Sequence, residues 1–181
     1  ASKPQMWFYD VNAKVNTALD DRNRLFFSLY SGGDHTVFNK LIKGYGMDWG
    51  NATATVRWNH ILNDRTNINT SAVFSNYYYR YKSLADGLQY LWKSDMQSYQ
   101  LKSDWETHLN NSLSLKTGAS VHFFTTMPGS VEKYGDESNV VPSRLPKKAL
   151  WDMAFYAEGE YKFLSRFQLN AGVRLSVLYA P

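Results

Sequence analysis

Residues 151–179 read WDMAFYAEGEYKFLSRFQLNAGVRLSVLY, and apolar and polar side chains alternate along most of this stretch. Alternation with a period of two is typical of β-strands that have one apolar and one polar face. Two such runs around a tight break at Leu164–Ser165 predict a β-hairpin whose arms are about twice the usual strand length. The apolar positions are Trp151, Met153, Phe155, Ala157, Gly159, Tyr161 and Phe163 in the first arm, and Phe167, Leu169, Ala171, Val173, Leu175, Val177 and Tyr179 in the second.

The same alternation recurs through the rest of the chain. It predicts six more strands, over Met6–Leu19, Arg24–Tyr30, Trp49–Leu62, Asn67–Tyr81, Tyr99–Leu109 and Leu113–Phe123. Short polar turns are expected at Asp20–Asn23, Asn63–Thr66 and Asn110–Asn111, and longer connections at Ser31–Met47, Lys82–Asp95 and Met127–Lys148. The sequence therefore predicts an all-β fold: one antiparallel up-and-down meander of about eight long strands, forming a single domain over residues 1–181.

The composition agrees with a strand-rich protein and excludes several other classes. The chain has 13 Tyr, 10 Phe and 6 Trp, which favour strands, and no Cys, so disulfides and thiolate metal sites are excluded. Its net charge of +4 is mild and its basic residues are scattered among acidic ones, so no nucleic-acid partner is expected. No apolar run is long enough for a transmembrane helix, but a membrane-spanning β-strand needs only about 9–11 residues.

Strands with one apolar face occur both in soluble barrels, where that face points inward, and in outer-membrane barrels, where it faces lipid. Three features favour the membrane: short turns at one edge with long loops at the other, small residues such as Ala54 and Ala119 in mid-strand, and aromatic residues near the strand ends. The aromatic residues form two sets on the apolar face: Trp7, Tyr9, Tyr78, Trp151 and Tyr179 toward the long loops, and Trp58, Trp105, Tyr161, Phe163 and Phe167 toward the turns. We therefore expect a barrel wall in the bacterial outer membrane, in contact with its lipid.

The order of the strands predicts where the two ends of the chain lie. If the short turns are periplasmic, the first strand runs toward the periplasm and the last runs away from it, so both ends are extracellular. A small complete barrel normally begins and ends in the periplasm. We therefore expect a segment of a larger barrel, and hydrogen bonding between the strands of Val11 and Val173 would contradict this expectation.

Five segments carry a family resemblance: Phe8–Lys14, Leu29–Asp34, Asp48–Asn51, Arg57–His60 and Ala171–Leu175. They resemble barrel strands of TonB-dependent outer-membrane receptors of the type found in Bacteroidota. The resemblance implies a barrel of about 22 strands, a plug domain inside it, and a contact between the missing plug and the energising protein TonB. It also implies import of siderophore-iron, haem, vitamin B12, glycan or peptide, and it leaves open a surface lipoprotein as a further partner.

The chain shows no pattern that predicts catalysis, so we expect no enzyme activity. Glu158 with Glu160, and Asp104 with Glu106, share a strand face, but a water-filled barrel lumen or a contact with the plug explains such pairs better than acid–base chemistry. The four histidines, His35, His60, His108 and His122, lack metal-ligand spacing. Neither a phosphate-binding loop nor a nucleophile motif is present, and we expect no cofactor and no metal.

The two longest connections are expected to bear the ligand-binding residues, because loops on a rigid scaffold commonly do so. The candidates are Phe38, Tyr45 and Met47 in the first connection, and Tyr134 and Arg144 in the second. The sequence thus predicts part of an outer-membrane nutrient receptor. Two alternatives remain at this level: a self-contained eight-stranded outer-membrane barrel that acts as an adhesin or structural protein, and a soluble, lipocalin-like binding barrel.

Overall fold

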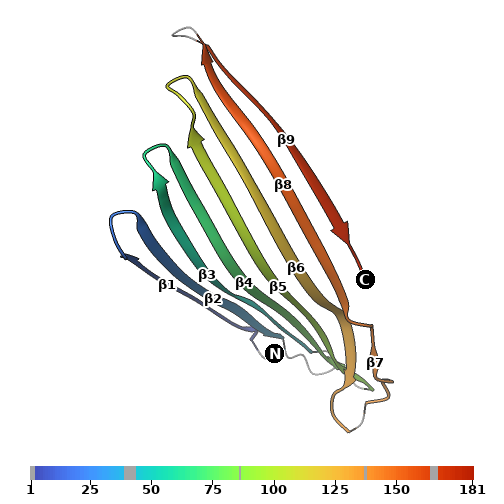
Figure 1. The fold of residues 1–181 in the computed structure, drawn as a ribbon. Helices are drawn as coiled ribbons and strands as arrows, with labels where there is room; N and C mark the ends of the chain where they lie inside the picture. The colour runs from blue at the N-terminus through green and yellow to red at the C-terminus, as the bar shows by residue number, and fades with distance from the viewer. Residues whose placement is uncertain (1–2, 39–43, 86, 137, 164–166) are drawn as a thin grey trace.

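The computed structural model describes residues 3–38, 44–85, 87–136, 138–163 and 167–181, which form one antiparallel sheet (Figure 1). Neighbours in the sheet are also neighbours in the chain, except that the two-residue β7 pairs with β6 alone and β8 follows β6 directly. The predicted all-β meander of eight long strands is therefore confirmed, with β7 added. The strands are β1 (Gln5–Ala18), β2 (Asn23–Phe38), β3 (Tyr45–Asn63), β4 (Thr66–Ala85), β5 (Leu88–His108), β6 (Leu113–Lys133), β7 (Ser143–Arg144), β8 (Lys148–Phe163) and β9 (Phe167–Tyr179).

The strands are longer than predicted, and the three predicted long connections are wrong over much of their length. Residues 31–38, 45–47, 82–85, 88–95 and 127–133 belong to strands. The Asp86-Gly87 dipeptide is a hairpin-turn signal that we overlooked, and Gly87 has the positive φ of 71° that such a turn requires. The predicted break at Leu164–Ser165 lies outside the described residues.

Three tight turns lie at one edge of the sheet, which we call the turn edge (upper left in Figure 1). Each is closed by an Asp or Asn side chain that accepts hydrogen bonds from the following backbone. Asp20 accepts from the Arg22 amide at 2.7 Å, Asn63 from Arg65 at 2.9 Å, and Asn110 from Ser112 at 2.8 Å. The Asn23 side chain and the Arg22 amide hold the pKa of the Asp20 carboxyl below its usual value.

The strand register aligns the alternating side chains into rows that cross the whole sheet. We call the two sides the apolar face and the polar face. One row of the apolar face consists of Val15, Phe27, Val56, Ala72, Leu101, Val121, Met153 and Val177. The neighbouring row of the polar face consists of Asn16, Phe26, Arg57, Ser71, Lys102, Ser120, Ala154 and Ser176.

The apolar face slants across these rows. Ala13 and Tyr179 lie in one row, which runs through all eight long strands. Along β1 the apolar face reaches the turn edge at Leu19, which is six residues beyond Ala13. Along β9 it reaches the turn edge at Phe167, which is twelve residues before Tyr179. The difference of six residues over seven strand-to-strand steps corresponds to a tilt of about 30°, from a rise of about 3.3 Å per residue and a spacing of about 4.8 Å. This tilt is close to that of the strands of closed barrels.

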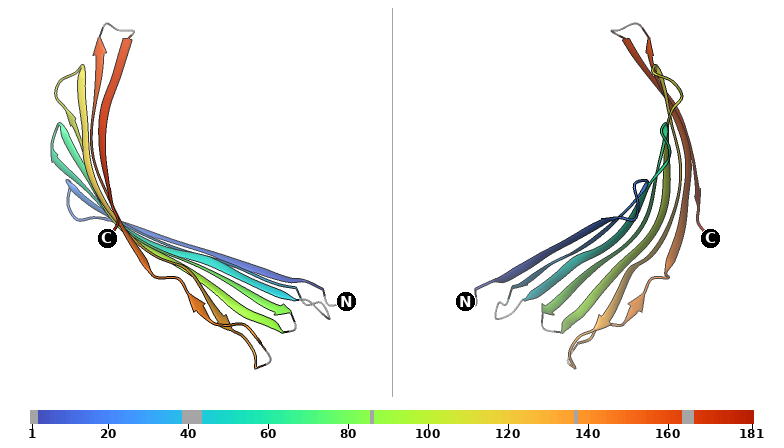
Figure 2. Two further views of the ribbon diagram at one scale, coloured as in Figure 1. Left: turned by 90° about the vertical axis from the view of Figure 1, so that its right-hand side faces the viewer. Right: turned by 60° about the vertical axis from the view of Figure 1, so that its left-hand side comes forward.

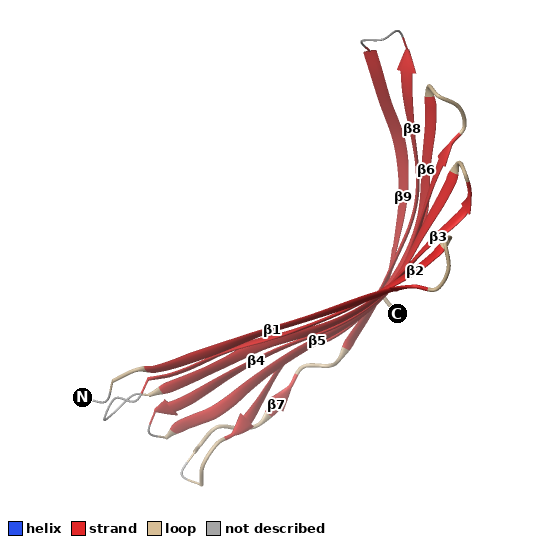
Figure 3. Ribbon diagram, turned by 90° about the vertical axis from the view of Figure 1, so that its left-hand side faces the viewer, coloured by secondary structure: helices blue, strands red, loops and turns tan. Residues whose placement is uncertain are grey.

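The sheet is twisted and curved, and no described residue forms a second layer against either face (Figures 2 and 3). Ile68 and Ala154 are the only apolar residues buried within the described part of the chain. On the central strand β5, Leu101 of the apolar face is 57% exposed, whereas Lys102 and Asp104 of the polar face are half-buried. A curved sheet spreads the side chains of its convex side and crowds those of its concave side, so we place the apolar face on the convex side.

The strands β1 and β9 are the two edges of the sheet and do not pair with each other. The strands of Val11 and Val173 therefore remain apart, and the sheet is not closed. This arrangement excludes the self-contained eight-stranded barrel for the described residues. No helix that is long and apolar enough to cross a membrane occurs in this part of the chain.

Candidate functional site

The two faces of the sheet exchange their character toward the loop edge, the edge opposite the tight turns. Tyr9 and Tyr78 share an aromatic row of the apolar face, and Trp7 on β1 is the one aromatic ring besides the His35 imidazole in the described part of the row beyond it. That next row places His35, Asp48, Arg80 and Lys93 on successive strands. On the opposite side, the polar face becomes aromatic over the same residues. This exchange divides the loop edge into a charged outer side and an aromatic inner side.

The charged outer side is held by three ion pairs between neighbouring strands. Arg80 pairs with Asp95 at 2.5 Å and Lys93 with Glu132 at 2.5 Å, while the His35 ring contacts the Asp48 carboxylate. The Arg80 guanidinium also donates to the carbonyls of Tyr79 and Ser94, each at 2.9 Å. Arg80 therefore fastens β4 to β5 just above the apolar rows.

We expect Arg80→Lys to lower the free energy of unfolding by about 1–2 kcal/mol, because lysine keeps the charge but loses the planar guanidinium that serves three acceptors. Urea titration of the folded protein in detergent measures the change. The control is Lys93→Arg, where a single ion pair is retained, and it is expected to change stability by less than about 0.5 kcal/mol. Equal losses of unfolding free energy at the two positions would contradict a special role for the Arg80 guanidinium.

Seven side chains on the aromatic inner side form a cluster that we call the rim patch: Phe38, Tyr45, Met47, Tyr79, Tyr81, Tyr90 and Trp92. They come from β2, β3, β4 and β5 and occupy three adjacent rows of one face. Met47, Tyr81 and Trp92 share the middle row, which is flanked by the rows of Tyr45 and Tyr79. The curvature of the sheet therefore gathers residues from four strands on its concave side.

Four rings of the rim patch form successive contacts, of which the first two are stacked and the third is tilted. The ring centroids of Phe38 and Tyr45 are 4.8 Å apart, those of Tyr45 and Tyr81 are 6.3 Å apart, and those of Tyr81 and Tyr90 are 6.0 Å apart. The Tyr79 hydroxyl donates to the Met47 sulfur at 3.7 Å. Burial raises the pKa of Tyr81, and the nearby hydroxyls of Tyr90, Tyr79 and Tyr45 act in the same direction, so this hydroxyl stays protonated at neutral pH.

The structure brings three of the five predicted binding residues together and separates the other two from them. Phe38, Tyr45 and Met47 lie in the rim patch, on strand ends rather than in the predicted loop. Tyr134 lies on the other side of the sheet, with the Lys82 ammonium 4.6 Å from its ring centre. Arg144 pairs with Ser130 in the row of Lys93, so it also belongs to the charged outer side.

Tyr79 and Tyr81 lie in the predicted strand Asn67–Tyr81 but on its polar face, and Tyr90 and Trp92 lie in the predicted connection Lys82–Asp95, so none of the four was a predicted binding residue. A signal was present: Tyr77, Tyr79 and Tyr81 alternate along one strand, and Tyr90 and Trp92 continue the pattern on the next. These positions lie on the predicted polar face, so their aromatic character did not fit a strand of constant polarity.

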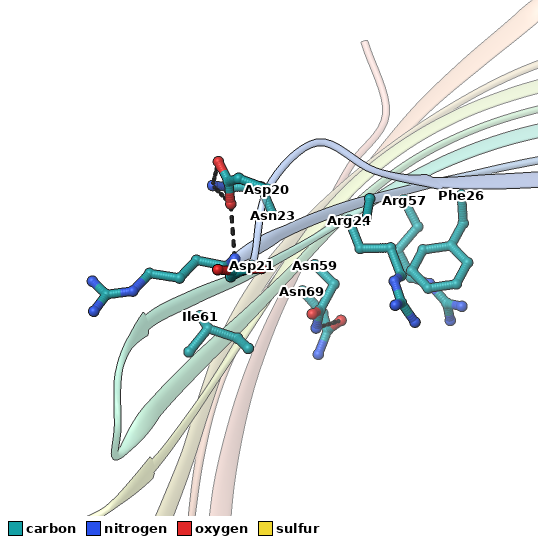
Figure 4. A pocket seen from close by; sticks show the side chains of 11 residues that line it. Asp20, Asp21, Asn23, Arg24, Phe26, Arg57, Asn59, Ile61 and Asn69 are labelled. Carbon is teal, nitrogen blue, oxygen red and sulfur yellow. Dashed lines mark hydrogen bonds between the residues drawn. The ribbon is translucent and has the colours of Figure 1, made fainter.

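A second feature is a concavity of about 650 Å³ at the turn edge (Figure 4). Arg24, Phe26 and Arg57 line it from the polar face, and the Arg57 guanidinium lies 4.5 Å from the centre of the Phe26 ring. No carboxylate within the described ranges forms an ion pair with Arg24 or Arg57. Asp20, Asp21 and Arg22 of the turn also line the concavity, so its charged groups are mixed, with three arginines against two aspartates.

The carboxylates singled out in the sequence are dispersed along the polar face. Lys102 pairs with Asp104 at 2.8 Å, and Lys162 with Glu160 at 3.2 Å. The Tyr156 hydroxyl donates to Asp104. Within the residues that the structure places, no group of three His, Asp or Glu side chains could hold a metal ion.

Comparison with solved structures shows a similar fold in the ferric preacinetobactin receptor BauA from Acinetobacter baumannii. The match has a TM-score of 0.72 at 12% sequence identity, and it covers 98% of this chain but 34% of that one. The chain thus spans about a third of the length of BauA. No family model and no curated protein match the sequence.

Proposed function

We propose that this chain is a wall segment of a TonB-dependent outer-membrane receptor that imports a nutrient without chemistry on it. The observation that carries the proposal is the uncovered apolar face. Along β5 it runs from Tyr99 to Leu109, the residue that follows the strand, a height of about 28 Å at the tilt derived above. This height is close to the apolar band of outer-membrane barrels, and lipid is the environment that an apolar convex face of this size requires.

The polar face is then the inner wall of the barrel. Its side chains at the turn edge, including Arg24, Arg57, Asp104 and Glu158, suit contact with water and with a plug domain. The segments that resemble receptors of the Bacteroidota type support such a plug and its contact with TonB. The similarity of fold to BauA supports a receptor barrel, and the convex position of the apolar face argues against a soluble, lipocalin-like barrel.

Cysteine labelling tests the proposed membrane orientation, and the chain has no cysteine of its own. We expect Val141→Cys, near the loop edge, to react with a membrane-impermeant maleimide in intact cells that express the full-length protein. Asp64→Cys, in the turn between β3 and β4, is expected to react only after the outer membrane is permeabilised. Both positions are exposed and lie outside the strands, so burial does not explain a difference.

The opposite labelling order would contradict the proposed orientation. Recovery of the protein from lysed cells without detergent would contradict the membrane location itself. Leu101→Cys serves as the matched control, because a lipid-facing thiol is expected to react with a lipid-soluble maleimide and to resist the impermeant one.

A further inference from the structure

We propose that the rim patch binds a neutral, hydroxyl-rich ring ligand, that is, a glycan. The inference rests on the proposed function, because it takes the concave face near the loop edge to be the inner mouth of the barrel. Three properties of the patch carry it: free tyrosine hydroxyls, rings that cover one another, and the distribution of charge.

The tyrosines of the rim patch present hydroxyl groups without partners in the described part of the chain. Tyr45, Tyr81 and Tyr90 form no hydrogen bond to another described residue, and none of these oxygens is sealed off from solvent. A phenolic hydroxyl donates one hydrogen bond and also accepts hydrogen bonds, as sugar hydroxyls do. The patch therefore matches a ligand that carries many donors and acceptors at short spacing.

The stacking of the rings limits which part of each ring a ligand can reach. Phe38, Tyr45 and Tyr81 lie nearly parallel, with interplanar angles of 24° and 21° between successive rings. Rings that stack on each other present edges and hydroxyls to a ligand rather than free faces. A flat aromatic ligand such as haem gains most from free faces, so this packing favours a hydroxylated ligand.

Charge distinguishes the glycan from an anionic metal chelate. Among the described residues of the three rows, Asp34 and Lys133 are the charged side chains, and they lie at opposite borders of the patch. The middle row consists of Met6, Thr36, Met47, Tyr81, Trp92, Val131 and Ser143. Anionic ligands are bound by arginine and lysine, whereas this surface offers hydroxyls and apolar edges to a neutral one.

The test is binding of the purified full-length receptor in detergent to a panel of neutral oligosaccharides, with haemin and a ferric catecholate chelate as comparison ligands. We expect at least one oligosaccharide to bind. Tyr81→Phe removes a single hydroxyl and is expected to weaken that binding about three- to tenfold. Trp92→Ala is expected to weaken it about tenfold or more. Tyr134→Phe, on the charged outer side, is the matched control and is expected to leave the affinity unchanged.

Haemin or the chelate binding in place of every oligosaccharide would overturn the inference, as would no binding at all. Oligosaccharide binding that is insensitive to both Tyr81→Phe and Trp92→Ala would place the ligand elsewhere. The labelling experiment with Val141→Cys and Asp64→Cys separates this inference from the proposed function. If the expected labelling is found but no glycan binds, the receptor proposal stands and the ligand class is wrong.

Discussion

Val56→Arg is expected to destabilise the protein in lipid by about 2–4 kcal/mol, because under the proposed function it places a cation on the side that faces lipid near the bilayer midplane. Val56 lies at the middle of the apolar face on β3, between Ala52 and Leu62, and its side chain is 42% exposed. Its row is apolar across all eight long strands. Neighbouring side chains in this row therefore offer an arginine no counter-ion. Urea titration of the full-length protein folded into phosphatidylcholine vesicles measures the effect.

The matched control is Thr55→Arg, one residue earlier on the same strand. Thr55 lies on the polar face, in a row with Ser28 and Gln100, where a charge meets water or polar groups. We expect a change of less than about 0.5 kcal/mol there. A larger loss at Thr55 than at Val56 would reverse the assignment of the faces. The apolar face would then be the covered one, as in a soluble barrel.

The pair Val56 and Thr55 illustrates what the sequence predicts well. Between the turn edge and the aromatic row of Tyr9 and Tyr78, one environment acts on each face along the whole strand. Alternation alone then identifies the faces, and the register follows from the turns. For this reason the strands and the three Asx-closed turns were predicted from the residues.

The loop edge was not predicted because the environments of the two faces change there. Arg80 continues the alternation of Tyr78 on the apolar face, and Tyr79 and Tyr81 continue that of polar residues. A search for strands of constant polarity ends at this exchange and assigns the remainder to loops. The rim patch depends on pairing among four strands, which a single strand does not specify, so only Phe38, Tyr45 and Met47 were anticipated.

Gly50→Ala is expected to destabilise the protein by about 1–3 kcal/mol, because the new methyl group has no room. A Cβ at Gly50 would lie 2.6 Å from the Gly32 carbonyl oxygen and 2.7 Å from the Tyr78 hydroxyl. Tyr78 crosses the sheet here above Gly33 and Gly50, which lie side by side on β2 and β3. The two glycines therefore let the rings of Tyr9 and Tyr78 lie close against the backbone, where the apolar face meets the charged outer side.

Gly159→Ala is the matched control, since it makes the same change on β8, where the nearest neighbouring atom to the new Cβ is the Ala171 carbonyl oxygen at 4.0 Å. We expect it to be neutral or to stabilise the fold by up to about 1 kcal/mol, because alanine restricts the unfolded chain. Adding Tyr78→Phe to Gly50→Ala removes the hydroxyl contact but keeps the ring carbon of residue 78 that lies 2.9 Å from the new Cβ, so it is expected to recover only part of the loss. A loss at Gly159 as large as that at Gly50 would mean that β-strand glycines are needed for the backbone itself. Full recovery by Tyr78→Phe would mean that the Gly32 carbonyl and the ring of residue 78 move without cost, and that the Tyr78 hydroxyl alone sets the requirement for glycine.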